Sequence, residues 1–285
     1  MNYFTEAEID QLIHEDFPFF DLTCQTIKIG SKVARISFTT TQNTVICGME
    51  EVLRIFEKFK ITPTLISFSG EHIESGIKFL EGEGLATSLH AICRTATNLM
   101  EFCSGISTRT KTLVTLANEV ATCIPIQIST KTVPFARKLT VKSICAGGGV
   151  IQNLGLSDMI LIGDNHIKFL GGIENLVKKI PEIKKRAVGK PVQIEVTTVR
   201  DAITLSQTAI DTLQIDRIAP DDLKKLICEI KKMNPTVKIA VSGDIDETNI
   251  EKFALTGADI LISSYPLYGK PSDFQVHIDP VFELY

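Results

Sequence analysis

Glycines and polar side chains gather in one stretch of the chain, residues 129–167. This stretch contains Lys131, a run of three glycines that includes Gly148 and Gly149, and His166 in an Asp-Asn-His cluster. Glycine has no Cβ, so its backbone N–H group can come close to an anion, and a lysine adds a point charge. The stretch therefore predicts a phosphate-bearing substrate.

The elements that must position these residues form a regular alternation of strands and helices. Such β–α steps fit a parallel sheet, either closed into a barrel or open and doubly wound. Polar residues follow the expected strands, and this favours the barrel because barrel enzymes do their chemistry at the carboxyl ends of strands. The expected strands are 124–129, 159–162, 192–196, 212–215, 238–242 and 259–263, with helices at 173–186, 199–208, 220–232 and 247–256.

Two carboxylates end neighbouring strands of this pattern, Glu195 and Asp216. Together they could hold Mg²⁺ and its waters against a polyphosphate, since Mg²⁺ prefers oxygen ligands. They could also be ordinary solvated strand ends. His166 follows two polar residues at a strand end, which indicates proton transfer or hydrogen bonding rather than a place in the core.

Small residues follow the last two expected strands, namely Ser242 with Gly243 and Ser263 with Ser264. Many barrels bind a phosphate at this place through backbone amides and hydroxyls. An ordinary turn would need small residues there too. We expect these four residues to form the phosphate site.

Arg94 is expected to open a helix. A cation at a helix N-terminus opposes the helix dipole, so Arg94 is expected to meet an anion. The plain alternative is a surface ion pair.

The first third of the chain mixes strands and helices without strict alternation, which indicates an α+β unit. A helical pattern begins near Thr95 and is expected to break at Gly105. The other expected helices are 6–15 and 50–59, and the expected strands are 26–29, 33–38, 44–48, 65–69 and 84–91.

The composition is that of a globular protein, with 285 residues, 44% of them hydrophobic and 22% charged. The net charge of −4 gives no basic field for nucleic acid. The acidic, amphipathic start is unlike a signal peptide, and no apolar run is long enough for a membrane span. A cytoplasmic protein that contacts neither nucleic acid nor membrane is the expectation.

The seven cysteines form no CxxC pair and no metal-finger spacing. An odd number without a secretory signal indicates reduced and mostly buried thiols. Cys145, just before the glycines, has the best position for a nucleophile, but a place in the core is the stronger expectation.

With these residues in view, the chain resembles the quinolinate phosphoribosyltransferase family, the nicotinate-nucleotide pyrophosphorylases, almost end to end. Within the family it is most similar to the ModD type, which is associated with molybdenum transport genes. The segments that carry the resemblance include EDFPFFDLT, RTATNLMEFCSGIST, TKTVPFARKL, AGGGVIQNLGLSDMILIGDNHI, QIEVTT, LQIDRIAPDDLKK and VSGDID.

The resemblance implies a type II phosphoribosyltransferase fold of the α/β class. An N-terminal α/β sandwich domain is expected over 1–107 and an incomplete (β/α) barrel over 108–269, with 270–285 packing back on the first domain. A homodimer or higher homo-oligomer is implied, in which the partner's N-terminal domain completes the barrel mouth. The implied reaction transfers phosphoribosyl from phosphoribosyl pyrophosphate (PRPP) to a ring nitrogen, with Mg²⁺ as cofactor.

The resemblance also assigns roles to single residues. Arg94 matches an arginine that contacts the substrate from the neighbouring subunit, and Lys131 matches a catalytic lysine. Glu195 and Asp216 match acidic residues near the ribose and the metal. Ser242, Gly243 and Ser263 match the phosphate loops.

Several family positions are changed here, and most of the changes remove positive charge. A dicarboxylate such as quinolinate needs compensating charge when it leaves water, so it is not expected to bind well. Gln152 and Asn153 replace a His-Arg pair and are the expected substrate contacts. The other changed positions are Thr130, Gly163, Ala240 and Asp244.

Three functions therefore stay open at this point. The leading one is a phosphoribosyltransferase-like pyrophosphorylase whose acceptor is unidentified and less acidic than quinolinate. The second is a quinolinate phosphoribosyltransferase (decarboxylating) of NAD biosynthesis. The third is a non-catalytic barrel that binds an anion or serves in regulation.

Overall fold

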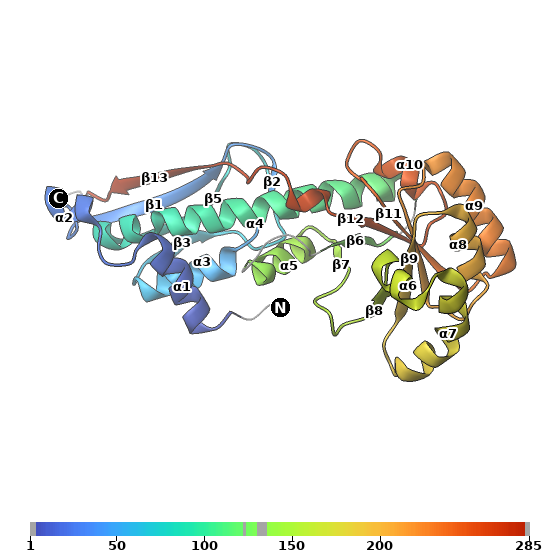
Figure 1. The fold of residues 1–285 in the computed structure, drawn as a ribbon. Helices are drawn as coiled ribbons and strands as arrows, with labels where there is room; N and C mark the ends of the chain where they lie inside the picture. Colours follow the sequence, from blue (N-terminus) through green and yellow to red (C-terminus); the bar gives the residue numbers. More distant parts are fainter. Residues whose placement is uncertain (1–3, 122–123, 130–135, 283–285) are drawn as a thin grey trace. The chain divides into compact units, whose positions relative to one another are not determined.

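The computed structural model describes residues 4–121, 124–129 and 136–282 (Figure 1), and the chain divides into two compact units. The first unit comprises residues 1–111, 133–148 and 267–285, and the second comprises 112–132 and 149–266. Residues 133–148 group with the first unit because Leu139 joins its hydrophobic core.

The first unit is built on a four-stranded antiparallel sheet in the order β13-β1-β5-β3. Strands β2 and β4 form a separate two-stranded antiparallel sheet. The strands of the first unit are β1 (Val33–Thr40), β2 (Thr44–Val45), β3 (Thr62–Ile66), β4 (His72–Ile73), β5 (Lys78–Leu85) and β13 (Phe274–Pro280). Its helices are α1 (Glu6–Asp16), α2 (Leu22–Ile27), α3 (Met49–Lys58), α5 (Arg137–Ala146) and α4 (Ala86–Val120), whose last turns from Thr112 belong to the second unit.

The core of the first unit lies between this sheet and its helices. Alternate residues of β1, such as Ile36 and Phe38, are fully buried, as period-two alternation predicts for a sheet covered on one face. Phe56 of α3 and Met100 of α4 join them in one cluster. Burial of large apolar side chains of this kind stabilises a fold by about 1.5–3 kcal/mol each.

The helix at 6–15 and the strand at 33–38 are confirmed, but two other predicted strands are wrong. Residues 26–29 fall at the end of α2 and beyond it, because Asp21 accepts a hydrogen bond from the Cys24 amide and starts a helix. Residues 84–91 straddle the end of β5 and the start of α4.

Two glycines of the first unit allow close packing between its elements. A Cβ on Gly82 would lie 2.6 Å from the Phe56 ring, so glycine lets α3 pack onto β5. Gly105 does not break α4, which continues through it. A Cβ there would lie 2.9 Å from the Lys270 carbonyl, so glycine lets the chain at Lys270 approach the helix. In both places glycine serves close packing, whereas in sequence it reads as a turn or a break.

The second unit is a curled parallel sheet of seven strands in the order β7-β6-β12-β11-β10-β9-β8, an incomplete barrel. Figure 1 shows its helices along the outside of the sheet. The predicted alternation is confirmed, and β7 is an addition to it. The strands are β6 (Ile126–Ile128), β7 (Val150–Ile151), β8 (Ile160–Ile162), β9 (Val192–Val196), β10 (Thr212–Asp216), β11 (Lys238–Ser242) and β12 (Ile260–Ser263). The helices are α6 (Asp164–Leu170), α7 (Ile173–Arg186), α8 (Val199–Ser206), α9 (Pro220–Met233) and α10 (Ile250–Ala254), with a 3₁₀ turn at Tyr265–Leu267.

Among the described residues, no helix is both long and apolar enough to cross a membrane.

A buried ion pair fastens α5 to α3 within the first unit. Lys142 lies 2.5 Å from Glu50 and also pairs with Glu51, whose side chain is only 4% exposed. Lys142→Met should destabilise the protein by about 3–5 kcal/mol, because it leaves a buried carboxylate without its partner. Urea denaturation would measure this loss.

Lys138→Met is the matched control on the same helix, since Lys138 pairs with Glu8 at the surface. Exposed pairs contribute about 0.2–1 kcal/mol, so this variant should stay close to the wild type. Equal losses of unfolding free energy in the two variants would contradict the claim that the buried Lys142 ion pair stabilises the fold more than a surface pair does.

Candidate functional site

Polar side chains line one face of the second unit's sheet near the carboxyl ends of its strands. Gln214 is paired in register with Glu195 on β9, and Asp216 with Ser242 on β11. Because alternate strand residues share a face, Gln214 and Asp216 point to the same side. The fold thus brings together the two predicted carboxylates and Ser242.

Gln214 is the centre of this arrangement. Its Nε2 donates to Glu195 Oε2 at 2.6 Å and to Ser242 Oγ at 2.9 Å. Its Oε1 accepts from Gln193 Nε2 at 2.5 Å and from Gln152 Nε2 at 3.4 Å. Gln214 is buried, so an amide with both donors and its acceptor engaged is held in a single orientation.

Asp216 is held from two sides. Its Oδ1 accepts the Ser242 hydroxyl at 2.7 Å, and its Oδ2 accepts Arg217 Nε at 2.7 Å. The hydrogen bond from Arg217 to Asp216 also raises the pKa of the Arg217 guanidinium. Arg217, an exposed cation at the strand end, was not among the residues predicted from the sequence.

The loop after β11 folds closely over Arg217. Gly243 has φ +113°, and a Cβ there would lie 2.7 Å from the Arg217 backbone nitrogen. Asp244 follows with φ +43°, and its charge adds to the raised pKa of Arg217. Arg217 therefore offsets part of the repulsion that Asp244 would exert on a phosphate.

The two serines after β12 differ. Ser263 is buried, and its hydroxyl donates to the Ile245 carbonyl at 2.6 Å and accepts from the Tyr265 amide at 3.1 Å. Its side chain holds the neighbouring loops together. Ser264 is half-buried.

Three expected substrate contacts lie in the second unit. Gln152 joins the network through Gln214, and Asn153 is half-buried with bonding partners of its own. His166 is exposed in the first turn of α6, and its Nδ1 accepts the Gly163 amide at 3.1 Å. That bond leaves the opposite ring nitrogen, Nε2, as the atom that could face a ligand.

The triple glycine ends α5 and offers fewer amides than expected. The Gly147 amide donates to Ser143 O at 3.1 Å and the Gly148 amide to Cys145 O at 3.0 Å. The boundary between the units falls between Gly148 and Gly149. An anion could reach the Gly148 amide only by breaking the helix end, because that donor is already used.

Cys145 is exposed rather than in the core, so that expectation is wrong. It lies near the end of α5, where partial burial raises the pKa of its thiol. A protonated thiol is a poor nucleophile, which disfavours Cys145 as a catalytic residue.

Arg94 lies in the first unit, inside α4 and not at its start, because the helix begins at Ala86. The dipole argument for its anion is therefore wrong. Its Nε lies 4.0 Å from Asp16, as in a surface ion pair, while its side chain stays 78% exposed. Lys131 and Thr130 lie outside the described residues.

Gly163 and Ala240, two positions at which the family resemblance implies a charged side chain, also lie in the second unit. A Cβ on Gly163 would come 3.9 Å from Glu195 Oε1, so a longer side chain there would reach this carboxylate. Ala240 is fully buried on β11, in register with Gln214. At these positions the chain leaves the site without a charge of its own.

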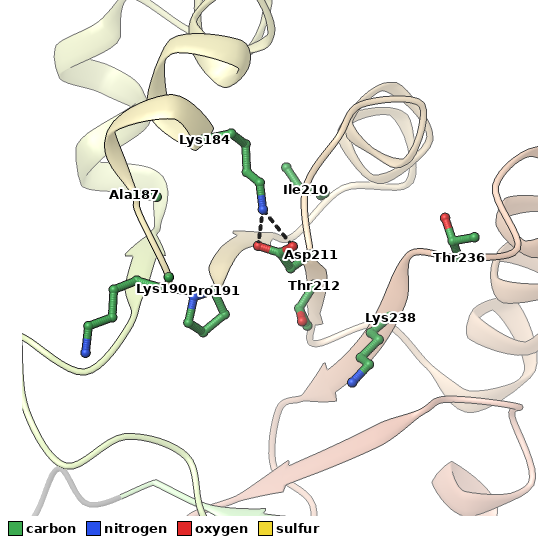
Figure 2. Close-up of a pocket in the computed structure, with 10 residues that line it drawn as sticks. Lys184, Ala187, Lys190, Pro191, Ile210, Asp211, Thr212, Thr236 and Lys238 are labelled. Atoms are coloured by element: carbon green, nitrogen blue, oxygen red, sulfur yellow. Dashed lines mark hydrogen bonds and ion pairs between the residues drawn. The ribbon is translucent and has the colours of Figure 1, made fainter.

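A hollow of about 680 Å³ lies at the opposite, amino ends of the strands, near the starts of β10 and β11 (Figure 2). Lys184 bonds both oxygens of Asp211 there, at 2.7 and 2.6 Å, while Lys190 and Lys238 extend away from this pair. None of the predicted site residues that the structure describes lines this hollow. In barrels this end serves stability, so we do not place the chemistry there.

Comparison with known proteins decides the family. Residues 106–277 match the quinolinate phosphoribosyl transferase C-terminal domain, and residues 21–104 match the N-terminal domain. The chain belongs to the quinolinate phosphoribosyl transferase family. It is accordingly an enzyme of the glycosyltransferase kind, with the acceptor unspecified.

Its relatives carry two kinds of name. The chain is 25% identical over 279 residues to "Putative pyrophosphorylase ModD" of Pasteurella multocida, covering 98% of this chain and 99% of that protein. It is 28% identical over 256 residues to "Probable nicotinate-nucleotide pyrophosphorylase" of Methanothermobacter thermautotrophicus, covering 89% and 91% of the two chains.

Solved structures share the fold. The nicotinate-nucleotide pyrophosphorylase from Ehrlichia chaffeensis gives a TM-score of 0.88 at 24% identity and covers 98% of this chain and 100% of that one. The enzyme from Francisella tularensis gives 0.87 at 23% identity and covers 98% of both chains. The predicted type II phosphoribosyltransferase fold is confirmed.

The close approach of Gly243 to Arg217 is testable. Gly243→Ala should cost about 1–2 kcal/mol for its positive φ and about 1–3 kcal/mol more for the clash with the Arg217 backbone. Thermal and urea unfolding would measure the total. The matched control is Gly257→Ala, with φ +89° but 3.7 Å to the nearest atom met by its Cβ.

The control should show the φ penalty alone. If both variants lost the same stability, the packing of the Gly243 loop onto Arg217 would be disproved.

Proposed function

We propose that this enzyme transfers phosphoribosyl from PRPP to a nitrogen acceptor that is less acidic than quinolinate. The observation that carries the proposal is the network of Glu195, Gln214, Asp216 and Ser242 at the carboxyl ends of three adjacent strands. Buried polar groups that hold two carboxylates at such a place suit a charged transition state better than they suit stability.

In the proposed reaction, the acceptor nitrogen forms a bond to C1 of the ribose while the bond from C1 to pyrophosphate breaks. Pyrophosphate leaves with the electron pair, and positive charge develops on C1. Glu195 and Asp216 stabilise that charge in the transition state more than in the bound substrate, which is the condition for catalysis.

Glu195 and Asp216 are also the proposed Mg²⁺ site. Their oxygens are the donors that Mg²⁺ prefers, and Mg²⁺ is commonly held by one or two carboxylates plus substrate phosphates. A carboxylate has about four lone-pair sites, so Asp216 can accept from Ser242 and Arg217 and still bind a ligand. When bound, Mg²⁺ would neutralise the leaving pyrophosphate.

We place the 5′-phosphate of PRPP at the loop of Ser242 and Gly243. Backbone amides of a tight turn favour an anion, and Arg217 supplies a cation beside it. Ser263 and Ser264 were predicted to bind the phosphate. We now propose that Ser263 instead supports this loop, since its hydroxyl is engaged with the Ile245 carbonyl. Lys131 remains a proposed cation of the donor site.

The acceptor follows from the charges that line the site. Gln152 is a neutral amide bonded to Gln214, and Gly163 has no side chain. A quinolinate dianion would find fewer charge-assisted bonds here, each of which contributes about 1.5–3 kcal/mol. The similarity to a protein named putative pyrophosphorylase ModD supports a pyrophosphorylase, and we propose molybdenum metabolism as its context.

We further propose that the enzyme acts in the cytoplasm as a homodimer in which Arg94 serves the partner's substrate. The exposure of Arg94 leaves its guanidinium available for such a contact. Analytical ultracentrifugation and mixing of Arg94 and Glu195 variants would test this arrangement.

Calorimetric titration of the protein with PRPP and Mg²⁺ tests the donor site. The wild type should bind, and Glu195→Gln and Asp216→Asn should each weaken binding by roughly 10–100-fold, because each removes a charge worth about 1.5–3 kcal/mol. Asp222→Asn, an exposed carboxylate on α9, makes the same charge change and should leave binding intact.

Wild-type protein that fails to bind PRPP at millimolar concentration would overturn the proposal. PRPP binding without release of pyrophosphate in the presence of any acceptor would instead support the anion-binding barrel. Pyridine nucleotide made from quinolinate would establish the quinolinate enzyme.

A further inference from the structure

Three side chains of different chemistry converge in the first unit, whereas the network described above belongs to the second. Asp21, Cys24 and His90 each direct one ligating atom into the same small region, with all three atoms within 4.8 Å of one another. Cys24 is buried, Asp21 is half-buried and His90 is exposed. The proposed transfer reaction uses none of them.

Two separate elements bring this cluster together. Asp21 accepts the Cys24 amide at 3.0 Å, which fixes the carboxylate and the thiol on one side of α2. His90 comes from α4, one helical turn before Arg94. Residues 66 or more positions apart in sequence thus meet on account of the fold, and not of local chain geometry.

We propose that Asp21, Cys24 and His90 bind a divalent metal ion of the zinc type, with water as the fourth ligand. A carboxylate, a thiolate and an imidazole form a donor set that Zn²⁺ accepts and that Mg²⁺ does not favour. Tetrahedral zinc with bonds of about 2.0–2.3 Å sets its ligand atoms roughly 3.3–3.7 Å apart. The ligating atoms lie within 4.8 Å of one another without metal, and the exposed His90 side chain has room to move to the shorter zinc-bound spacing.

Zinc binds a cysteine as the thiolate, so the buried Cys24 thiol must give up its proton when the metal arrives. On binding, a metal–sulfur bond forms as the S–H bond breaks, and the proton passes to solvent.

A metal here would supply what α2 lacks. Cys24 is the one buried residue of this six-residue helix, while Leu22 and Ile27 are 67% and 58% exposed. Little apolar burial holds α2 to the rest of the unit, so a metal bridge from α2 to α4 would stabilise it directly. The bridge would thus stabilise the segment that leads from α1 to β1.

The test uses tag-free full-length protein loaded with Zn²⁺ or Co²⁺. One zinc per chain should remain after dialysis, as measured by plasma emission, and the cobalt protein should show thiolate-to-cobalt charge-transfer absorption. Bound zinc should also slow tryptic cleavage after Lys28, the exposed residue that ends α2. PRPP binding is measured in parallel and should not depend on zinc.

The Cys24→Ser and His90→Gln variants should each fail to retain zinc, and added zinc should no longer slow their tryptic cleavage after Lys28. Loss of a ligand should weaken zinc binding by more than the roughly 10–100-fold typical of outer-shell changes. His90 is exposed, so its variant will fold even if Cys24→Ser does not. Cys145→Ser and His72→Gln remove an exposed thiol and an exposed imidazole elsewhere and should retain the metal.

Two results would overturn the proposal. One is a wild type that retains no zinc at micromolar concentration. The other is His90→Gln protein that binds as much zinc as the wild type, which would mean that the metal sits elsewhere.

Discussion

Gln214 lies at the centre of a buried polar row, and the second unit depends on satisfying it. A polar side chain in the interior of a sheet is costly unless each of its donors and acceptors is bonded. The side-chain amide of Gln214 is bonded to polar groups of β9, of β11 and of the loop after β7. These partners are Gln193, Glu195, Ser242 and Gln152. Apolar residues at these positions would pack a parallel sheet at lower cost.

We propose that this network serves chemistry rather than packing. Through Ser242 it reaches Asp216, and through Asp216 it reaches Arg217, so the carboxylates are oriented before any ligand arrives. Donors and charges that are already in place need no reorganisation in the transition state. The neutral amides in the row also set a limit, because they recognise polar groups but do not neutralise a dianion.

The regular parts of the fold could be predicted because their signal is local. Runs such as 192–196, 212–216 and 238–242 are hydrophobic and β-branched and are separated by amphipathic helices, so their strands were correctly placed. Gly105 misled the prediction because this glycine is needed for close packing against residues that are distant in the sequence. No local pattern announces such contacts.

The site could be predicted only in part for a related reason. Glu195 and Asp216 stand out as acids at strand ends, but their shared face follows from strand register, which the sequence does not state. Gln214 looks like any polar residue until its four partners are known. Arg94 was misplaced because the start of α4 depends on where β5 ends.

The central claim is that the carboxyl ends of β9, β10 and β11 form the donor site. The most direct measurement is a crystal structure of the protein with PRPP and Mg²⁺. The account predicts the 5′-phosphate at the Gly243 loop beside Arg217, and the metal between the pyrophosphate and the carboxylates of Glu195 and Asp216. PRPP bound instead in the lysine-lined hollow at the amino ends of the strands would contradict it.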